Sequence, residues 1–585
     1  MWEEPCISGT RGSGTVFFTG CVLKCVFCQN SVLAESKVGK PVTVSRLAEI
    51  FLELQNKGAH NINLVTPTHF VPSIRESIIL AKKNGLTLPI VYNTGSYESV
   101  ETIKSLEGLV DIYLPDLKYV SSELSKKYSK APDYFCTWNL QGYVVSYKST
   151  ELTRAAMTED YLFGDGPYQN WVDCYPAIRK DLYFVMDDSW DIPKGVNDSP
   201  NPYLGTVELS PDRFPSFGGD DVERLRQLSL KIKGKGWKGV GGWICAQKAE
   251  KYADIPEEEY WKRRIKVANE AGFDYWKVDW GKEDRNGEWR RRLTSMGKRY
   301  APHLYIEHAL RNEFIEFSDV FRTYDVENIM AQPITIQRIC DLLPYKTVNG
   351  AKGIINCEDE PYIAVGLGCA IGVMRHSFAG TLPDGTQDFV FPPTGRDIKR
   401  RLDEVVRGVR WHRIAVPFSV GNTAYAIDSV KLTDHWTLWE NETWNKGRKV
   451  GTDVIAVAPA RVARGMGLPE VSGAPLEVRP FVLASRYPNG AVAVVTIGRN
   501  LGREYVTEEV AVTVSIDRWD VPVGLLGYFK EVTMVFPSSI EKENRTVYAQ
   551  DLAGETPVDI TSKIVIKGNR LTIPGDVIRQ IGLMN

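Results

Sequence analysis

Strand-like and helix-like segments alternate from the N-terminus, and this alternation limits the fold more than any other feature of the 585-residue chain. Consecutive strand–helix pairs give parallel strands, because each helix returns the chain to the same end of the sheet. We therefore expect a parallel sheet covered by helices. The predicted strands span residues 15–19, 61–66, 89–93 and 110–114, and the predicted helices span 44–57 and 71–84.

This first module ends early. The alternation stops at residues 131–135, after four predicted strands. A partial parallel barrel of this kind leaves an unpaired edge and an uncovered apolar face. The rest of the chain or a partner protein could cover that face. A third possibility is that nothing covers it, because the gene is a truncated fusion whose first module never becomes a working enzyme.

A second strand–helix series runs from Cys136 to about Gly421 and predicts a larger (β/α)8 barrel, the TIM-barrel fold. After about residue 440, short alternating runs such as AVAVVTI predict an antiparallel β-sandwich. The predicted fold class is α/β with an all-β C-terminal part. The predicted domains are a partial module over 1–135, a barrel over 136–435 and a sandwich over 436–585.

The charge balance excludes two classes of partner. The chain has 71 basic and 73 acidic residues, a net charge of −2, and no block of like charges. We therefore expect neither nucleic acid nor a membrane as a partner. No run of about 18 apolar residues predicts a membrane span, and MWEEPCISGT lacks the features of a signal peptide. Ten cysteines in so long a chain favour a reducing compartment, and we expect a cytoplasmic protein.

Three cysteines near the N-terminus form a metal-binding motif. Cys21, Cys25 and Cys28 are spaced C-x3-C-x2-C in GCVLKCVFCQN, directly after a predicted strand. Three thiolates at this spacing suit a [4Fe–4S] cluster in which one iron is left open. A structural zinc knuckle or three ordinary core thiols are the alternatives.

The motif and its flanks resemble the radical S-adenosylmethionine (radical SAM) family. EEPCISGTRGSGTVFFTGC before the motif and NINLVTPTH after it are similar to the branch related to pyruvate formate-lyase activating enzymes. The resemblance covers residues 1 to about 135. It implies that the open iron binds S-adenosylmethionine and donates the electron that breaks its sulfonium bond.

Polar residues follow two predicted strands of the barrel. The apolar run in DLYFVMDDSWD ends in Asp187, Asp188 and Trp190, and AGFDYWKVDWG ends in Lys277 and Asp279. With a period of two residues along a strand, the last two side chains point the same way. Barrel enzymes gather their catalytic residues at the C-terminal ends of strands, so we expect these residues at the barrel mouth.

A later strand supplies a second carboxylate. FSDVFRTYDVEN brings Arg322 and Asp325 to another strand end, across the mouth from Asp279. Two facing carboxylates are what glycoside hydrolysis requires, because one attacks the anomeric carbon while the other gives a proton to the leaving oxygen. We predict that the configuration of the sugar is retained.

These motifs resemble glycoside hydrolase families 27 and 36, the clan of α-galactosidases and α-N-acetylgalactosaminidases, and family 27 more closely. DDSW, RFPS and YWKVDWG carry the resemblance. It implies that Asp279 is the nucleophile and Lys277 a hydroxyl ligand. Arg322 and Asp325 match the arginine that binds the sugar 2-hydroxyl and the acid/base. The sugar subsite is implied at Asp187, Asp188 and Trp190, with Trp190 stacking on the sugar.

The sequence departs from the family pattern in three places. The family usually has the spacing R-x-x-x-D, whereas Arg322 and Asp325 are one residue closer together. Glu327 is therefore the reserve candidate for the acid/base.

The other two departures concern substrate identity. The family's NDPD appears as NCED, which retains Asp359 as a substrate-binding residue. The segment LYIEHAL puts Glu307 and His308 where the substituents of the sugar are told apart. The exact glycoside therefore stays open.

These patterns predict a fusion of an iron–sulfur radical SAM module with a glycosidase that acts on α-galactoside-like carbohydrates. The rival interpretation is an activase-like radical enzyme whose barrel is a carbohydrate-binding passenger. A third interpretation is a binding protein in which neither site turns over.

Overall fold

A computed structural model describes most of the chain. The chain divides into two compact units, Met1–Lys130 and Ala131–Asn585. The described residues are 8–20, 39–95, 100–115, 131–323, 329–348, 350–378, 380–386, 398–421, 423–440, 442, 447–539 and 546–583.

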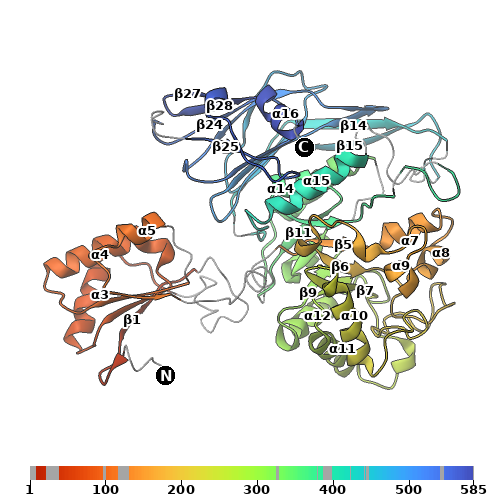
Figure 1. The fold of residues 1–585 in the computed structure, drawn as a ribbon, viewed down its shortest axis with the longest axis horizontal. Helices are drawn as coiled ribbons and strands as arrows, with labels where there is room; N and C mark the ends of the chain where they lie inside the picture. The colour runs from red at the N-terminus through yellow and green to blue at the C-terminus, as the bar shows by residue number, and fades with distance from the viewer. Residues whose placement is uncertain are drawn as a thin grey trace. The chain divides into compact units, whose positions relative to one another are not determined.

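The first unit contains a small parallel sheet, coloured red to orange in Figure 1. Its strands lie in the order β1 (Gly14–Phe17), β2 (Ile62–Val65), β3 (Ile90–Thr94) and β4 (Ile112–Pro115), and each pair is parallel. This arrangement confirms the predicted sheet. The connecting helices are α3 (Val44–Asn56), η1 (Thr68–Phe70), α4 (Val71–Lys83) and α5 (Val100–Ser105).

Helices α3 and α4 pack against the strands of this sheet. The Thr43 hydroxyl caps α3 by accepting a hydrogen bond from the Arg46 amide at 3.2 Å. Leu47 and Phe51, one helical turn apart on α3, are buried with Ile74 of α4 in a single core. The amphipathic pattern of the two helices therefore accounts for the packing of this unit.

Apolar side chains on the edge strands of this sheet stay exposed. Phe17 on β1 is 49% exposed and Ile112 on β4 is 41% exposed. In the described part of the sheet, β1 pairs only with β2 and β4 only with β3. Each edge strand thus leaves a row of backbone groups without a strand partner.

Eight described strands of the second unit close into a parallel barrel. Each strand pairs with the next, and the last returns to the first with Gly372 opposite Tyr134. The closed barrel confirms the predicted (β/α)8 fold. The strands are β5 (Tyr134–Cys136), β6 (Tyr183–Met186), β7 (Gly239–Ile244), β8 (Tyr275–Val278), β9 (Tyr305–His308), β10 (Val320–Arg322), β11 (Ile354–Glu358) and β12 (Ala370–Val373).

Helices surround the barrel, and α11 illustrates how the sequence sets their ends. Its first turn carries three glutamates, which complement the helix dipole, and it stops at Gly272, whose φ is +70°. No helix in the described ranges is long and apolar enough to span a membrane. The helices are α7 (Trp138–Val144), α8 (Thr150–Ala155), α9 (Glu159–Phe163), η2 (Trp171–Asp173), η3 (Arg179–Asp181), α10 (Asp221–Gly234), η4 (Glu250–Tyr252), α11 (Glu257–Ala271), α12 (Gly287–Tyr300), η5 (Asn312–Phe317), α13 (Ala331–Leu342), α14 (Pro361–Gly366) and α15 (Ile398–Trp411).

The barrel begins before the residue at which the sequence pattern places its start. Residues 131–135 are predicted to end the first module, yet Tyr134 opens β5. The Asp133 carboxylate accepts a hydrogen bond from the Ile371 amide at 2.8 Å and lies 2.6 Å from Nδ1 of His412. This segment is therefore hydrogen-bonded to β12 and to the residue that follows α15. A strand of three residues is too short for alternation along the sequence to reveal it.

The C-terminal part is built from β-sheets, as predicted, but the pairing is mixed. The pairs β14–β20, β16–β18, β19–β23 and β22–β24 are parallel, whereas the sequence pattern predicts an antiparallel sandwich. Alternation along a strand reports burial of one face and not the direction of its neighbour. The elements are β13 (Tyr425–Ile427), β14 (Lys431–Thr437), β15 (Asp453–Pro459), β16 (Arg461–Arg464), β17 (Glu470–Ser472), β18 (Phe481–Arg486), β19 (Val492–Ile497), β20 (Arg499–Gly502), β21 (Glu504–Val506), β22 (Val510–Ser515), β23 (Val523–Leu526), β24 (Phe529–Val535), β25 (Tyr548–Ala549), β26 (Val558–Asp559), η8 (Thr561–Lys563), β27 (Val565–Lys567), β28 (Arg570–Pro574) and α16 (Gly575–Leu583).

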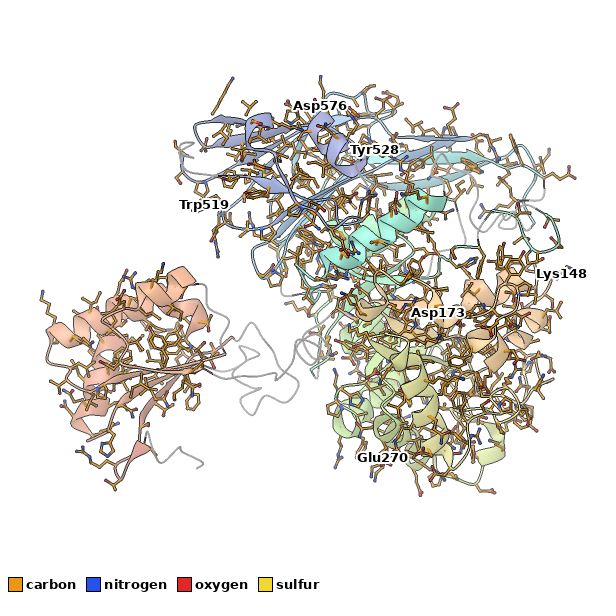
Figure 2. The ribbon with its side chains drawn as sticks, viewed as in Figure 1. Lys148, Asp173, Glu270, Trp519, Tyr528 and Asp576 are labelled. Atoms are coloured by element: carbon orange, nitrogen blue, oxygen red, sulfur yellow. The ribbon has the colours of Figure 1, made fainter. Side chains whose placement is uncertain are left out.

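The barrel and the sheets share one hydrophobic core. Val365 of α14 is fully buried with Leu483 of β18 and Val495 of β19. Arg464 of β16 is 1% exposed and donates a hydrogen bond to the carbonyl oxygen of Leu367 at 2.6 Å. Figure 2 shows side chains between α15 and the sheets above it. The sheets are thus packed onto the barrel as part of its interior.

Candidate active site at the barrel mouth

Five barrel strands, β6 and β8 to β11, bring six charged side chains together at their C-terminal ends. None of the six is more than 7% exposed. Lys277 and Asp279 face the same side, as predicted, while the alternate residues Trp276 and Val278 of β8 face the outer core. We call the six residues the mouth cluster: Asp187, Lys277, Asp279, Glu307, Arg322 and Glu358.

Asp279 is held as a carboxylate. Its Oδ1 lies 3.0 Å from Nη2 of Arg322, and its Oδ2 accepts a hydrogen bond from the Trp243 indole at 3.0 Å. Burial alone would raise the pKa of Asp279, but the charges of Arg322 and Lys277 and the Trp243 hydrogen bond bring it below its ordinary value. A fixed and ionised carboxylate is suited to nucleophilic attack.

Arg290 contacts the backbone of Asp279. Its guanidinium donates a hydrogen bond to the backbone oxygen of Asp279 at 2.5 Å and lies 3.1 Å from Nδ1 of His308. The other ring nitrogen of His308 lies 2.8 Å from the Thr294 hydroxyl. Burial and the Arg290 charge keep the pKa of His308 well below its ordinary value. His308 therefore belongs to this support, and it does not join the mouth cluster beside Glu307.

Lys277 pairs with Asp187 beside an unexpected thiol. Its Nζ lies 2.8 Å from Oδ2 of Asp187 and 3.4 Å from Sγ of Cys136. The Cys136 thiol donates a hydrogen bond to the same carboxylate oxygen at 2.9 Å. Although burial lowers the pKa of Lys277, the charge of Asp187 leaves it well above its ordinary value. Lys277 is thus a permanent cation in the mouth cluster.

Glu307 is saturated by protein donors. The Tyr275 hydroxyl donates to its Oε2 at 2.7 Å and the Asn356 amide donates to the same oxygen at 2.8 Å, while Nε of Arg322 lies 3.7 Å from Oε1. Burial raises the pKa of Glu307, and the charge of Arg322 opposes that rise. The geometry makes Glu307 a support for Arg322.

Glu358 is the member that sequence reasoning missed. It points to the same side of β11 as Asn356, as a two-residue period requires, and the Tyr134 hydroxyl donates to its Oε1 at 3.0 Å. Asp359 follows the strand with φ of +52°, and its Oδ1 accepts hydrogen bonds from the amides of Met374 at 2.8 Å and Arg375 at 3.0 Å. The two-residue alternation in NCED could have identified Glu358. The family resemblance drew attention to Asp359 instead.

Asp359 keeps one unused acceptor oxygen. Its Oδ2 is buried and has no hydrogen-bond partner within the described ranges. Burial raises the pKa of Asp359 to about 6, although the charge of Arg375 opposes this. A substrate hydroxyl could satisfy this oxygen.

Replacing Asp359 by Asn is expected to stabilise the barrel above pH 6. Because its pKa rises from 3.8 to about 6 on folding, the stability contributed by the protonated form is complete below about pH 4. It is lost as the pH rises through 6, at a cost of about 3 kcal/mol. Asparagine has no such proton to lose. The midpoint of thermal unfolding should therefore be higher for the variant than for the unsubstituted protein at pH 8, and the two midpoints should be equal at pH 4. Equal differences at both pH values would contradict the prediction.

The side chains of Asp188 and Trp190 are bound by residues outside the mouth cluster. Asp188 pairs with Arg154 at 2.9 Å, and burial raises the pKa of Asp188 to about 6 against the effect of that charge. Trp190 is fully buried in the outer core, where its indole donates to the carbonyl oxygen of Trp243 at 2.8 Å. A ring with no exposed face cannot stack on a sugar, so we correct the predicted role of Trp190 to packing.

Five predicted site residues lie outside the described residues. They are Cys21, Cys25 and Cys28 of the cluster motif, and Asp325 and Glu327 after β10. No group of three His, Cys, Asp or Glu side chains that could hold a metal occurs among the residues that the structure does describe.

The N-terminal segment matches a known family. The model described as the radical SAM superfamily matches residues 15–137. This segment is a radical SAM domain. The match passes Lys130 and takes in β5, the first strand of the barrel. An uncharacterized protein of Methanocaldococcus jannaschii is 34% identical to the chain over 132 residues, 21% of this chain. The chain spans 38% of the length of that curated relative.

Solved glycosidase structures are similar in fold to the middle half of the chain. An α-galactosidase I from Mortierella vinacea is 11% identical, with 56% of this chain and 94% of that chain covered and a TM-score of 0.31. A family 27 β-L-arabinopyranosidase from Geobacillus stearothermophilus is 13% identical, with coverages of 52% and 73% and a TM-score of 0.29. With TM-scores near 0.3, these likenesses carry no weight for the chemistry of the barrel.

Proposed function

We propose that the barrel is a retaining glycoside hydrolase acting on α-galactoside-like carbohydrates. The observation that supports it most is the state of Asp279, a buried carboxylate kept ionised by Arg322 and Trp243 at a barrel mouth. The sequence motifs around Asp187, Lys277 and Asp279 supply the substrate class by resemblance. An enzyme of this kind needs no metal for the hydrolysis.

In this mechanism, Asp279 attacks the anomeric carbon and the bond to the leaving oxygen breaks. Asp325 gives that oxygen its proton, and the sugar is left bound to Asp279 as an ester. Water then attacks the same carbon, returns a proton to Asp325 and frees Asp279. Lys277 and Arg322 are proposed to hold sugar hydroxyls. Asp187, Asp188 and Asp359 are proposed as acceptors for other hydroxyls.

Hydrolysis of a 4-nitrophenyl α-galactoside is expected to release the α-anomer of the sugar first. Two successive inversions at one carbon restore the starting configuration. Proton NMR during the first minutes of turnover distinguishes the two anomers before they equilibrate. The β-anomer as first product would contradict the assignment of Asp279 as the nucleophile. Failure to hydrolyse any α-glycoside, with sugar binding retained, would favour the carbohydrate-binding passenger.

We further propose that Cys21, Cys25 and Cys28 of the radical SAM domain hold a [4Fe–4S] cluster with S-adenosylmethionine at the open iron. Such a cluster supplies the electron for reductive cleavage of that cofactor. Three thiols at C-x3-C-x2-C are a suitable donor set, and a reducing cytoplasm is where they would persist. The rival function is a radical enzyme whose barrel only binds carbohydrate, and the match over residues 15–137 favours keeping it.

The open sheet of the radical SAM domain is proposed to need a partner. Phe17 and Ile112 leave apolar surface exposed on the two edge strands. The curated relative has more than half of its length beyond the matched region. We propose that a partner protein or subunit covers this surface.

A further inference from the structure

Glu358 lies between the two cations of the mouth cluster. Its Oε1 is 3.8 Å from Nζ of Lys277 and 3.7 Å from Nη1 of Arg322. The Tyr134 hydroxyl fixes the same oxygen with a hydrogen bond of 3.0 Å. The glycosidase families that the barrel resembles by motif have proline at this position of NDPD, so this carboxyl group is a feature of the present chain.

The two cations are already engaged by other carboxylates. Lys277 lies 2.8 Å from Asp187, and Arg322 lies 3.0 Å from Asp279. Counting Glu307, which lies 3.7 Å from Arg322, four carboxyl groups of the mouth cluster share two cations. An added anion at the barrel mouth would meet an excess of negative charge that no further side chain of the mouth cluster offsets.

One carboxyl oxygen of Glu358 is also available as a hydrogen-bond acceptor. Of its two oxygens, only Oε1 receives a hydrogen bond or lies near a cation within the described part of the barrel. By contrast, both oxygens of Asp187 accept hydrogen bonds, Oδ1 from the Asp188 amide and Oδ2 from Cys136 and Lys277. The free Oε2 is thus placed to accept a hydrogen bond from a donor on the substrate.

We propose that Glu358 determines specificity by selecting a neutral sugar that donates a hydroxyl to it and by rejecting an anionic sugar such as a uronide. This inference rests on the proposed function and names the substrate class of the same site. A hydroxyl satisfies Oε2, whereas a carboxylate in its place would face a like charge and lack a donor. Removing the charge while keeping the shape should therefore weaken the discrimination.

The experiment compares galactose and galacturonate on the full chain, with and without Glu358→Gln. Neither free sugar has a glycosidic bond to hydrolyse, so calorimetry reports binding alone. Galactose is expected to bind at least about tenfold more tightly than galacturonate when Glu358 is present, because one like-charge contact costs on the order of 1.4 kcal/mol. Glu358→Gln is expected to reduce this ratio to about threefold or less.

Two features of the design keep the outcome readable. Both ligands are titrated into one preparation, so the ratio does not depend on the fraction of folded protein. Glu404→Gln is the matched control. Glu404 is a buried carboxyl group of α15 that lies 3.8 Å from Arg375 and outside the mouth cluster. It should leave the ratio unchanged.

An unchanged ratio in Glu358→Gln would overturn the inference, and so would tighter binding of galacturonate when Glu358 is present. Failure of the proposed hydrolysis is separable from both results. If the unsubstituted protein turns over no α-galactoside and the binding ratio still falls in Glu358→Gln, the selection by Glu358 is supported in a binding protein. If galactose does not bind any variant, both proposals fail.

Discussion

Replacing Asp279 by Ala is expected to lower kcat/KM for a chromogenic α-galactoside by roughly 10⁴-fold or more, the usual loss when a covalent nucleophile is removed. Among the described residues, no other carboxylate lies as close as 3.0 Å to Arg322 and could attack in place of Asp279. Initial rates of nitrophenol release measure the effect. Asp284→Ala is the control, because Asp284 lies on the same loop. Its hydrogen bond from Arg290 goes to the backbone oxygen, which Ala retains.

Azide is expected to restore part of the activity of Asp279→Ala. A small anion can occupy the space left by the carboxylate and attack the anomeric carbon, giving a β-galactosyl azide from an α-galactoside. Asp279→Asn fills that space, so azide should not rescue it. Unchanged turnover in Asp279→Ala would refute the assigned nucleophile, because another group would then have to carry out the attack.

Replacing Cys21, Cys25 and Cys28 together by Ala is expected to remove all iron from protein reconstituted without oxygen. Three thiolates are the minimum set that fixes a cluster with one open iron, so each single replacement should also abolish it. Iron analysis and the broad visible absorption of the cluster provide the measurement. Cys174→Ala should keep the full iron content, because this free thiol lies outside the motif.

Two results would contradict the cluster assignment. One is zinc in place of iron in the unsubstituted protein, which would indicate a structural knuckle. The other is iron retained by the triple variant. In either case hydrolysis by the barrel should be unaffected, because Asp279 and its partners belong to the other unit.

Much of the fold could be predicted from local patterns. The strands of the radical SAM domain lie within a few residues of their predicted positions, and helices α3 and α4 agree with the helices expected over 44–57 and 71–84. These elements have strong periodicity and clear ends, such as the Thr43 hydroxyl that caps α3. Period two along β8 was enough to place Lys277 and Asp279 on one side.

Other features depend on contacts between distant segments. β5 is only three residues long, and its identity as a strand comes from pairing with β6 and β12. The parallel pairs in the C-terminal sheets follow from chain topology, which alternation does not encode. Trp190 looked suitable for stacking on a sugar beside two aspartates, yet the core position of its ring is set by Phe273 at 5.7 Å, far along the sequence.

The site illustrates the same division. The motif resemblance identified Asp187, Lys277, Asp279 and Arg322, which the structure brings into ion-pair contact. It gave no reason to examine Cys136, Trp243 or Glu358, because these residues are unlike the family pattern or lie outside its motifs. Their roles appear only as distances to the other members of the site.

The shared core of barrel and sheets has a genetic consequence. All the candidate catalytic and sugar-binding residues are encoded before codon 360, so the last third of the gene contributes no chemistry to the proposed reaction. Val365 and Leu367 nevertheless rely on β16, β18 and β19 for burial and for the Arg464 hydrogen bond. A nonsense or frameshift mutation downstream of the active-site codons would therefore leave the barrel with an exposed apolar side. Such an allele should behave as a null even though every reactive group is still translated.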